Sequence, residues 1–104
     1  MNKHRNVRTE YNGVVYQSAK EARYAAELDL RVRAHDIHSW YRQVSLPLSI
    51  NGKLICKYVI DFIIYHNDGT MEYVEVKGRE EPVWKLKWAL FEALYPNLKK
   101  VVVR

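Results

Sequence analysis

A run of β-branched and aromatic side chains from Tyr58 to Tyr65 dominates the middle of the sequence, and only Asp61 interrupts it. A second run of this kind covers residues 70–77, after the turn residues His66-Asn67-Asp68-Gly69. Runs of this length bounded by turn residues are typical of strands. We therefore predict two antiparallel strands, over residues 57–65 and 70–77, at the centre of a sheet.

The length and composition predict an ordinary small globular protein. A chain of 104 residues is expected to form a single domain over residues 1–104, and a composition of 48% hydrophobic and 28% charged residues argues against disorder. The lone Cys56 excludes an internal disulfide and favours a reducing compartment. Since no long apolar run or secretory leader is found, we expect no membrane span and a cytoplasmic location.

The other elements follow from turn and capping residues. Asn12-Gly13 predicts a hairpin within residues 7–16, and Ser18 with Glu21 opens a helix that runs to about residue 34. Pro47 confines a strand over residues 39–50 to an edge or a bend. The remaining elements are a turn at Asn51-Gly52, a helix over 83–95 with Pro82 in its first turn, and a strand over 99–104. The fold class is α/β, more strictly α+β.

The carboxylate of Asp61 needs a partner, because an unpaired charge buried in a sheet costs several kcal/mol. By itself, Asp61 is explained by a salt bridge or a backbone hydrogen bond. A three-residue turn with a left-handed Gly69 would also place it directly opposite Glu75, with the Cβ atoms about 5 Å apart. Two such acids share a proton or bind a cation, and oxygen ligands suit Mg²⁺ or Mn²⁺. A two-residue turn would instead set Glu75 against Phe62, on the wrong face.

Two further charged residues converge on this pair. Lys77 lies two residues beyond Glu75 and therefore on the same face of the strand. Glu21 has a plain explanation in the capping box with Ser18. It also shares a helical stripe with the apolar residues that should face the sheet, which are Tyr24, Ala25, Leu28 and Val32.

These residues carry a resemblance to a known family. Asp61, thirteen residues, and then Glu75-Val76-Lys77 resemble the Asp…Glu-x-Lys signature of the PD-(D/E)XK nuclease superfamily, although Ile60 replaces the usual proline. Within it, the chain resembles a small phage-encoded family, similar to phage endonuclease I and other Holliday junction resolvases. The matching segments are residues 11–22, Gln43, Asp61-Phe62, residues 75–78, residues 85–91 and Tyr95-Pro96.

The resemblance implies a restriction-endonuclease-like core, in which a mixed four-stranded β-sheet is flanked by helices. It implies that Asp61, Glu75 and the backbone carbonyl of Val76 bind Mg²⁺, with Mn²⁺ able to substitute, and that Glu21 joins them directly or through water. Lys77 would orient or help deprotonate the attacking water. The chemistry would be metal-assisted hydrolysis of a phosphodiester.

Other residues are weaker candidates. Gln43, Lys87 and Ser18 could lie beside the metals, although Lys87 could equally snorkel from the edge of the core and Gln43 could be merely exposed. The net charge of +5 favours a polyanion such as DNA. The candidate phosphate-contacting residues are Arg5, Arg8, Lys20, Arg23, Arg31, Arg33, Lys85, Lys99 and Lys100.

The function that the sequence favours is a Mg²⁺-dependent endonuclease acting on branched DNA, such as a phage recombination intermediate. Cutting both strands of a junction requires a homodimer, with the N-terminal hairpin or the aromatic stripe of the second helix as candidate interfaces. That stripe is Trp84, Trp88, Phe91 and Tyr95. One alternative is a nicking or restriction-like nuclease on duplex DNA. Another is a non-catalytic nucleic-acid-binding or assembly module, which would have no need of four converging charged groups.

Overall fold

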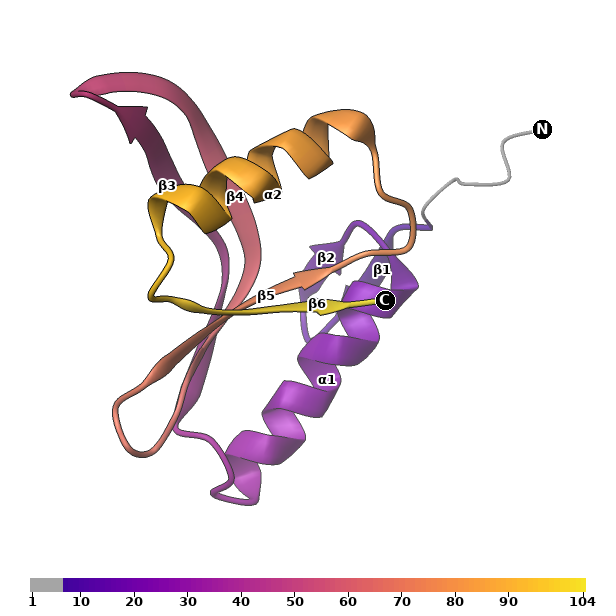
Figure 1. Ribbon diagram of the computed structural model, residues 1–104. Helices are drawn as coiled ribbons and strands as arrows, with labels where there is room; N and C mark the ends of the chain where they lie inside the picture. The colour runs from indigo at the N-terminus through magenta and orange to yellow at the C-terminus, as the bar shows by residue number, and fades with distance from the viewer. Residues whose placement is uncertain (1–6) are drawn as a thin grey trace.

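The computed structural model describes residues 7–104, and in it six strands and two helices follow one another as drawn in Figure 1. The elements are β1 (Thr9–Tyr11), β2 (Val14–Tyr16), α1 (Ala19–Arg33), β3 (Ser39–Ile50), β4 (Lys53–Tyr65), β5 (Met71–Val76), α2 (Pro82–Leu94) and β6 (Lys99–Val103). Each of the predicted elements is present.

The strands form two sheets. The N-terminal hairpin β1-β2 stands alone, and the main sheet has the order β3-β4-β5-β6. Strands β3, β4 and β5 are antiparallel neighbours, whereas β6 returns after α2 to lie parallel to β5. The predicted α+β fold with a mixed four-stranded sheet is therefore confirmed, with β4 and β5 at its centre and β3, which contains Pro47, at an edge.

The two helices cover opposite faces of the sheet. Side chains alternate along each strand, so neighbouring residues of a strand pack against different helices. Leu28 of α1 packs with Phe62 and Val74 in one core cluster. Phe91 of α2 packs with Tyr73 in the other. Leu28 and Phe91 are fully buried, so truncation of either side chain to alanine is expected to cost roughly 2–5 kcal/mol.

The aromatic stripe of α2 belongs to this second cluster. Trp84 and Phe91 are buried, and Trp88 and Tyr95 pack against them. The Trp84 indole N–H donates to the Tyr58 hydroxyl at 2.9 Å. The stripe is therefore part of the core on this side of the sheet.

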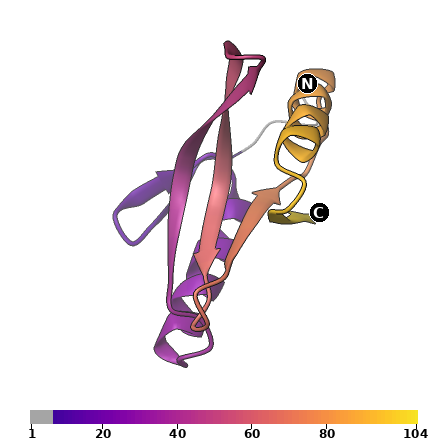
Figure 2. The same ribbon diagram turned by 60° about the vertical axis from the view of Figure 1, so that its left-hand side comes forward.

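The hairpin of β3 and β4 extends beyond the rest of the sheet and runs beside α2 (Figure 2). Asn51 and Gly52 form its turn with φ of 51° and 78°, as the Asn-Gly pair predicts. β4 begins at Lys53 and not at Lys57, so the predicted strand was four residues too short. The added residues include Leu54 and Ile55, which are both exposed.

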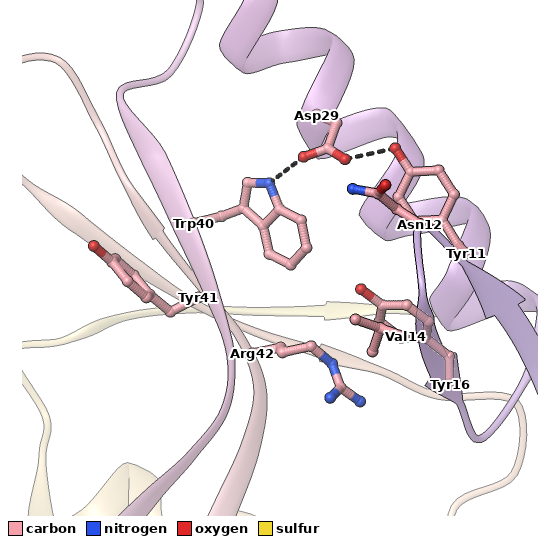
Figure 3. Close-up of a pocket in the computed structure, with 8 residues that line it drawn as sticks. All are labelled: Tyr11, Asn12, Val14, Tyr16, Asp29, Trp40, Tyr41 and Arg42. Atoms are coloured by element: carbon pink, nitrogen blue, oxygen red, sulfur yellow. Dashed lines mark hydrogen bonds between the residues drawn. The ribbon is translucent and has the colours of Figure 1, made fainter.

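Asp29 of α1 attaches the N-terminal hairpin to the main sheet (Figure 3). One carboxylate oxygen accepts the Tyr11 hydroxyl of β1 at 2.5 Å. The other accepts the indole N–H of Trp40, in β3, at 2.9 Å. The hairpin is therefore held by polar contacts as well as by the packing of Tyr16.

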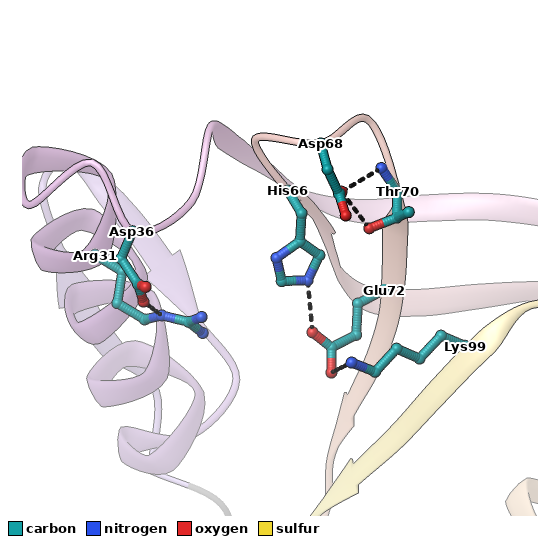
Figure 4. A network of polar contacts seen from close by, with 7 residues as sticks. All are labelled: Arg31, Asp36, His66, Asp68, Thr70, Glu72 and Lys99. Carbon is teal, nitrogen blue, oxygen red and sulfur yellow. Dashed lines mark hydrogen bonds and ion pairs between the residues drawn. The ribbon is translucent and has the colours of Figure 1, made fainter.

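The turn between β4 and β5 sets the register of the central strands. Gly69 has φ of 89°, and the His66 N–H donates to the Thr70 carbonyl at 2.8 Å. The Asp68 carboxylate accepts the backbone N–H of Thr70 at 2.9 Å and its hydroxyl at 2.7 Å (Figure 4). The resulting pairs include Phe62 with Val74, which confirms the three-residue turn and excludes the two-residue alternative.

Among residues 7–104, neither helix has the length and apolar character that a membrane crossing requires.

Candidate functional site

In strands β3 and β4, the side chains change from one face of the sheet to the other at neighbouring positions. In β4, Ile60 packs in the cluster under α2, whereas Phe62, two residues on, packs in the cluster under α1. In β3 the same reversal separates Arg42, whose guanidinium lies over the Tyr16 ring, from Val44. Strict alternation would keep residues two apart on one face, so both strands twist locally between these positions.

Gln43 and Asp61 occupy this twist. The pairs on either side are Arg42 with Phe62 and Val44 with Ile60, and Gln43 and Asp61 are not paired with each other. Gln43 has φ of 55°, a left-handed conformation that is uncommon for a residue other than glycine. Asp61 therefore stands where the two faces of the sheet meet, within reach of residues from both.

The first such residue is Glu75 of β5. Its Oε1 accepts the backbone N–H of Asp61 at 3.1 Å, and the Asp61 Oδ2 accepts the backbone N–H of Val76 at 2.8 Å. The two acids are neighbours, as the register predicts. The backbone hydrogen bond that would explain Asp61 by itself is present as well.

Glu75 is almost completely buried, with 2% of its surface exposed. Burial, together with the negative charge of Asp61, raises the pKa of its carboxyl group to about 7. The Lys77 ammonium, 3.6 Å from Oε2, opposes this rise. The same ammonium lies 4.7 Å from the centre of the Trp84 ring, so a cation–π contact holds it beside the acid.

Glu21 joins the pair from the first turn of α1. Ser18 caps the helix by accepting the Glu21 N–H at 3.1 Å, as predicted. The side chain of Glu21 is half-buried, and burial followed by the charge of Asp61 raises its pKa to about 7. Burial also raises the pKa of Asp61, although the Val76 N–H and Lys77 lower it. The predicted residues Glu21, Asp61, Glu75 and Lys77 thus share one electrostatic environment, which we term the carboxylate site.

Lys20 links the start of α1 to the C-terminal end of β5. Its ammonium donates to the carbonyl of Lys77 at 3.1 Å. Lys20 was a candidate DNA contact, and here it fixes the start of the helix that carries Glu21.

Arg42 is a residue of the site that the sequence reasoning missed. Its positive charge lowers the pKa values of both Glu21 and Asp61. A signal was available in the sequence. Residues 40, 42, 44, 46 and 48 are every second residue of an edge strand, and all of them are apolar except Arg42. That pattern marks a charge at an inward-facing position.

The three weaker candidates for a place beside the metals lie in different parts of the structure. Gln43 is exposed at the strand twist opposite Asp61, and Ser18 acts as the helix cap. Lys87 lines an apolar groove between α2 and the β3-β4 hairpin, next to Leu86 and Leu90. The structure gives Lys87 no contact with the carboxylate site.

The candidate DNA-contacting residues are partly used within the protein. Arg31 pairs with Asp36 at 2.8 Å and Lys99 with Glu72 at 3.8 Å (Figure 4). Lys100 donates to the carbonyls of Tyr95 and Leu98. Arg5 lies outside the described residues. The exposed candidates are Arg8, Arg23, Arg33, Lys85 and Lys99.

The donor set suits a hard divalent cation, because its ligands would all be carboxylate or carbonyl oxygens. Burial, and after it the charge of Asp61, raises the pKa values of Glu21 and Glu75, and a bound cation would relieve the repulsion among the three acids. In residues 7–104, no three His, Cys, Asp or Glu side chains already stand together as metal ligands. One oxygen of Asp61 and one of Glu75 accept backbone N–H groups, as described above.

The fold and this site define a small α+β protein in which the buried Glu75 lies beside Asp61 on the two central strands of a mixed sheet. The chain belongs to the family described as "Protein of unknown function (DUF1064)", whose model matches residues 1–104. No curated protein and no solved structure matches the chain.

Proposed function

We propose that this protein is a Mg²⁺-dependent DNA endonuclease of the PD-(D/E)XK type, which hydrolyses phosphodiester bonds. One observation carries the proposal, namely the convergence of Glu21, Asp61 and Glu75 with Lys77 in a protein of net charge +5. A buried group of like charges is unfavourable in a structural role, since an apolar cluster of similar volume would be as stable or more so. Catalysis supplies a reason for retaining it.

The residues would divide the work in the following way. Asp61, Glu75 and the carbonyl of Val76 would hold the metal, and Glu21 would complete its coordination directly or through water. Bound Mg²⁺ supplies a polarised phosphoryl oxygen and a water of lowered pKa. Lys77 is held by Glu75 and the ring of Trp84, a position from which its ammonium can donate a hydrogen bond to the attacking water and orient it.

The preferred substrate under this proposal is branched DNA, processed in the cytoplasm of a bacterial host during phage recombination. Contacts to phosphates position DNA without reading its base sequence, which favours recognition of DNA shape. A duplex-nicking or restriction-like nuclease is the nearest alternative. A non-catalytic binding module would explain the net charge of +5 and leave the carboxylate site without a role.

Cleavage of both strands of a junction needs two active sites, so the proposal includes a homodimer. α2 offers a surface for the second copy because it is apolar on its outer side as well. Leu86 is 71% exposed and lines a groove of about 580 Å³ with Ile50 and Ile55 of the hairpin. Exposed apolar side chains clustered in one groove are typical of protein–protein contacts.

The test is a comparison of four-way junction, flap, single-stranded and linear duplex DNA, each incubated with the protein and Mg²⁺. The proposal predicts cleavage of the junction or flap well above that of linear duplex. Equal cleavage of all substrates would favour the duplex nuclease. Binding without cleavage, unchanged in the Asp61→Asn variant, would favour the binding module.

A further inference from the structure

A cavity of about 350 Å³ opens between the N-terminal hairpin, α1 and β3 (Figure 3). This volume lies within the usual range for small-ligand sites, which begins at about 300 Å³. The residues that line the cavity include Tyr11, Tyr16, Asp29, Trp40 and Arg42.

The aromatic wall of the cavity is held in place by Asp29. Its two carboxylate oxygens accept the Tyr11 hydroxyl and the Trp40 indole N–H, so neither ring turns without losing a hydrogen bond. Both side chains are only partly buried. The cavity therefore presents positioned aromatic surface, which binds a planar ring at small entropic cost.

Arg42 supplies a cation at the same place. Its guanidinium is stacked 4.5 Å from the centre of the Tyr16 ring, and Tyr16 is itself buried. The Nε of Arg42 is buried and has no hydrogen-bond partner among the described residues. A buried donor left unpaired is unfavourable, and an acceptor oxygen bound to this guanidinium would relieve that penalty.

Arg42 also connects this cavity with the carboxylate site. Arg42 lowers the pKa values of Glu21 and Asp61, so its charge acts directly on the carboxylate site. A phosphate oxygen bound to Arg42 would thus lie within the electrostatic range of these acids. Arginine binds phosphate through two parallel N–H groups, and Nε is one of the donors it uses.

We infer that this cavity is a subsite for one unpaired nucleotide, whose phosphate binds Arg42 and whose base packs against Trp40 and Tyr11. A base within a duplex is stacked between its neighbours and cannot offer its face to these rings. The inference rests on the proposed function, because it takes DNA as the substrate. It adds that the protein recognises an unstacked nucleotide next to the cleaved bond, as found at a junction, flap or bulge.

The test measures binding in EDTA, so that it does not depend on cleavage. Fluorescence anisotropy would compare a labelled duplex that carries a single unpaired thymidine with the fully paired duplex of otherwise identical sequence. Stacking of one base is worth about 1–3 kcal/mol, so the wild-type protein should bind the bulged duplex about ten-fold more tightly. Arg42→Gln should remove this preference, so that the variant binds the two duplexes equally.

Lys53→Gln is the matched control, since it also removes one positive charge but lies exposed at the far end of the β3-β4 hairpin. It should keep the preference. Arg42→Lys keeps the charge and loses the fork of donors, so it should retain only part of the preference. Circular dichroism of each variant establishes that it is folded.

Equal affinity of the wild-type protein for the two duplexes would overturn the inference, and so would a preference that survives in Arg42→Gln. If the protein cleaves DNA with Mg²⁺ but shows no preference, only this subsite is wrong. If the preference is found and no DNA is cleaved with Mg²⁺, the subsite stands and the proposed nuclease activity is wrong.

Discussion

The Glu75 carboxylate accepts the backbone N–H of Asp61 at 3.1 Å, and one residue further along the Val76 N–H donates to the Asp61 carboxylate at 2.8 Å. Side-chain oxygens thus take the place of backbone carbonyls where the β4-β5 ladder ends. The two acids are fixed by the same kind of bond that holds the strands. Their closeness is therefore built into the sheet and does not depend on a flexible loop.

The first prediction concerns the stability of Asp61 variants. From like-charge repulsion alone, Asp61→Ala would cost little stability. The structure adds that the alanine variant leaves the Val76 N–H without its acceptor, and Val76 is buried. We therefore expect Asp61→Ala to be about 1–2 kcal/mol less stable than Asp61→Asn, whose amide oxygen can still accept.

Urea denaturation in EDTA measures this difference. Both variants should lose cleavage activity, because neither retains the charge that a metal needs. If Asp61→Ala equals Asp61→Asn in stability, the hydrogen bond to Val76 contributes nothing and the rigid placement of Asp61 is in doubt.

The second prediction concerns pH in the absence of metal. Glu21 and Glu75 have pKa values of about 7 in the folded protein, raised from 4.5. The folded state therefore binds protons more tightly than the unfolded state. The contribution of these groups to stability is fully present below about pH 4.5 and is lost as the pH rises through about 7.

Thermal melting in EDTA between about pH 5 and pH 8 checks this sign. The wild-type melting temperature should fall over that range, and the fall should be smaller in Glu75→Gln, which resembles the protonated acid at every pH. Glu92→Gln is the control, since Glu92 is exposed on α2 and its removal should leave the profile unchanged. A wild-type profile identical to that of Glu75→Gln would contradict the shift.

The third prediction concerns metal binding. A divalent cation would replace the protons on Glu21 and Glu75, so its affinity should increase as the pH rises through about 7. Isothermal titration with Mg²⁺, or with Ca²⁺ where turnover must be avoided, should show binding at about pH 8 that is much weaker at about pH 6. Glu75→Gln should abolish it. Binding of equal strength at both pH values would place the cation elsewhere.

The fourth prediction concerns the dimer. Leu86→Asp introduces a charge into the apolar groove of α2 and should convert a dimer to a monomer in sedimentation experiments. Leu30→Asp makes the same change at an exposed position on α1 and should leave the assembly unchanged. If the wild-type protein is a monomer at all concentrations, the homodimer proposal is wrong. If Leu86→Asp stays dimeric, the groove is not the interface.

Most of the fold could be predicted because short-range signals determine it. Gly69, with its positive φ, fixes the length of the β4-β5 turn, and that length alone sets Phe62 against Val74. The Asn-Gly pairs fix two further hairpins in the same way. The start of β4 could not be predicted, because Leu54 and Ile55 form an exposed extension whose pattern no buried face constrains.

The candidate site was only partly predictable. The neighbouring positions of Asp61 and Glu75 follow from the turn, and the placement of Glu21 follows from its helical stripe. The left-handed conformation of Gln43 carries no sequence signature, and it decides which face Arg42 joins. Asp29 was missed for a similar reason, since its partners Tyr11 and Trp40 come from distant elements.

The measurement that tests the central claim most directly is the cleavage of a labelled four-way DNA junction with Mg²⁺ and with EDTA, by the wild-type protein and by Glu75→Gln. The account predicts cleavage only by the wild-type protein with Mg²⁺, and a loss of at least about a hundred-fold in the variant. Cleavage in EDTA, or an equal rate in Glu75→Gln, would contradict a metal-dependent nuclease at the carboxylate site.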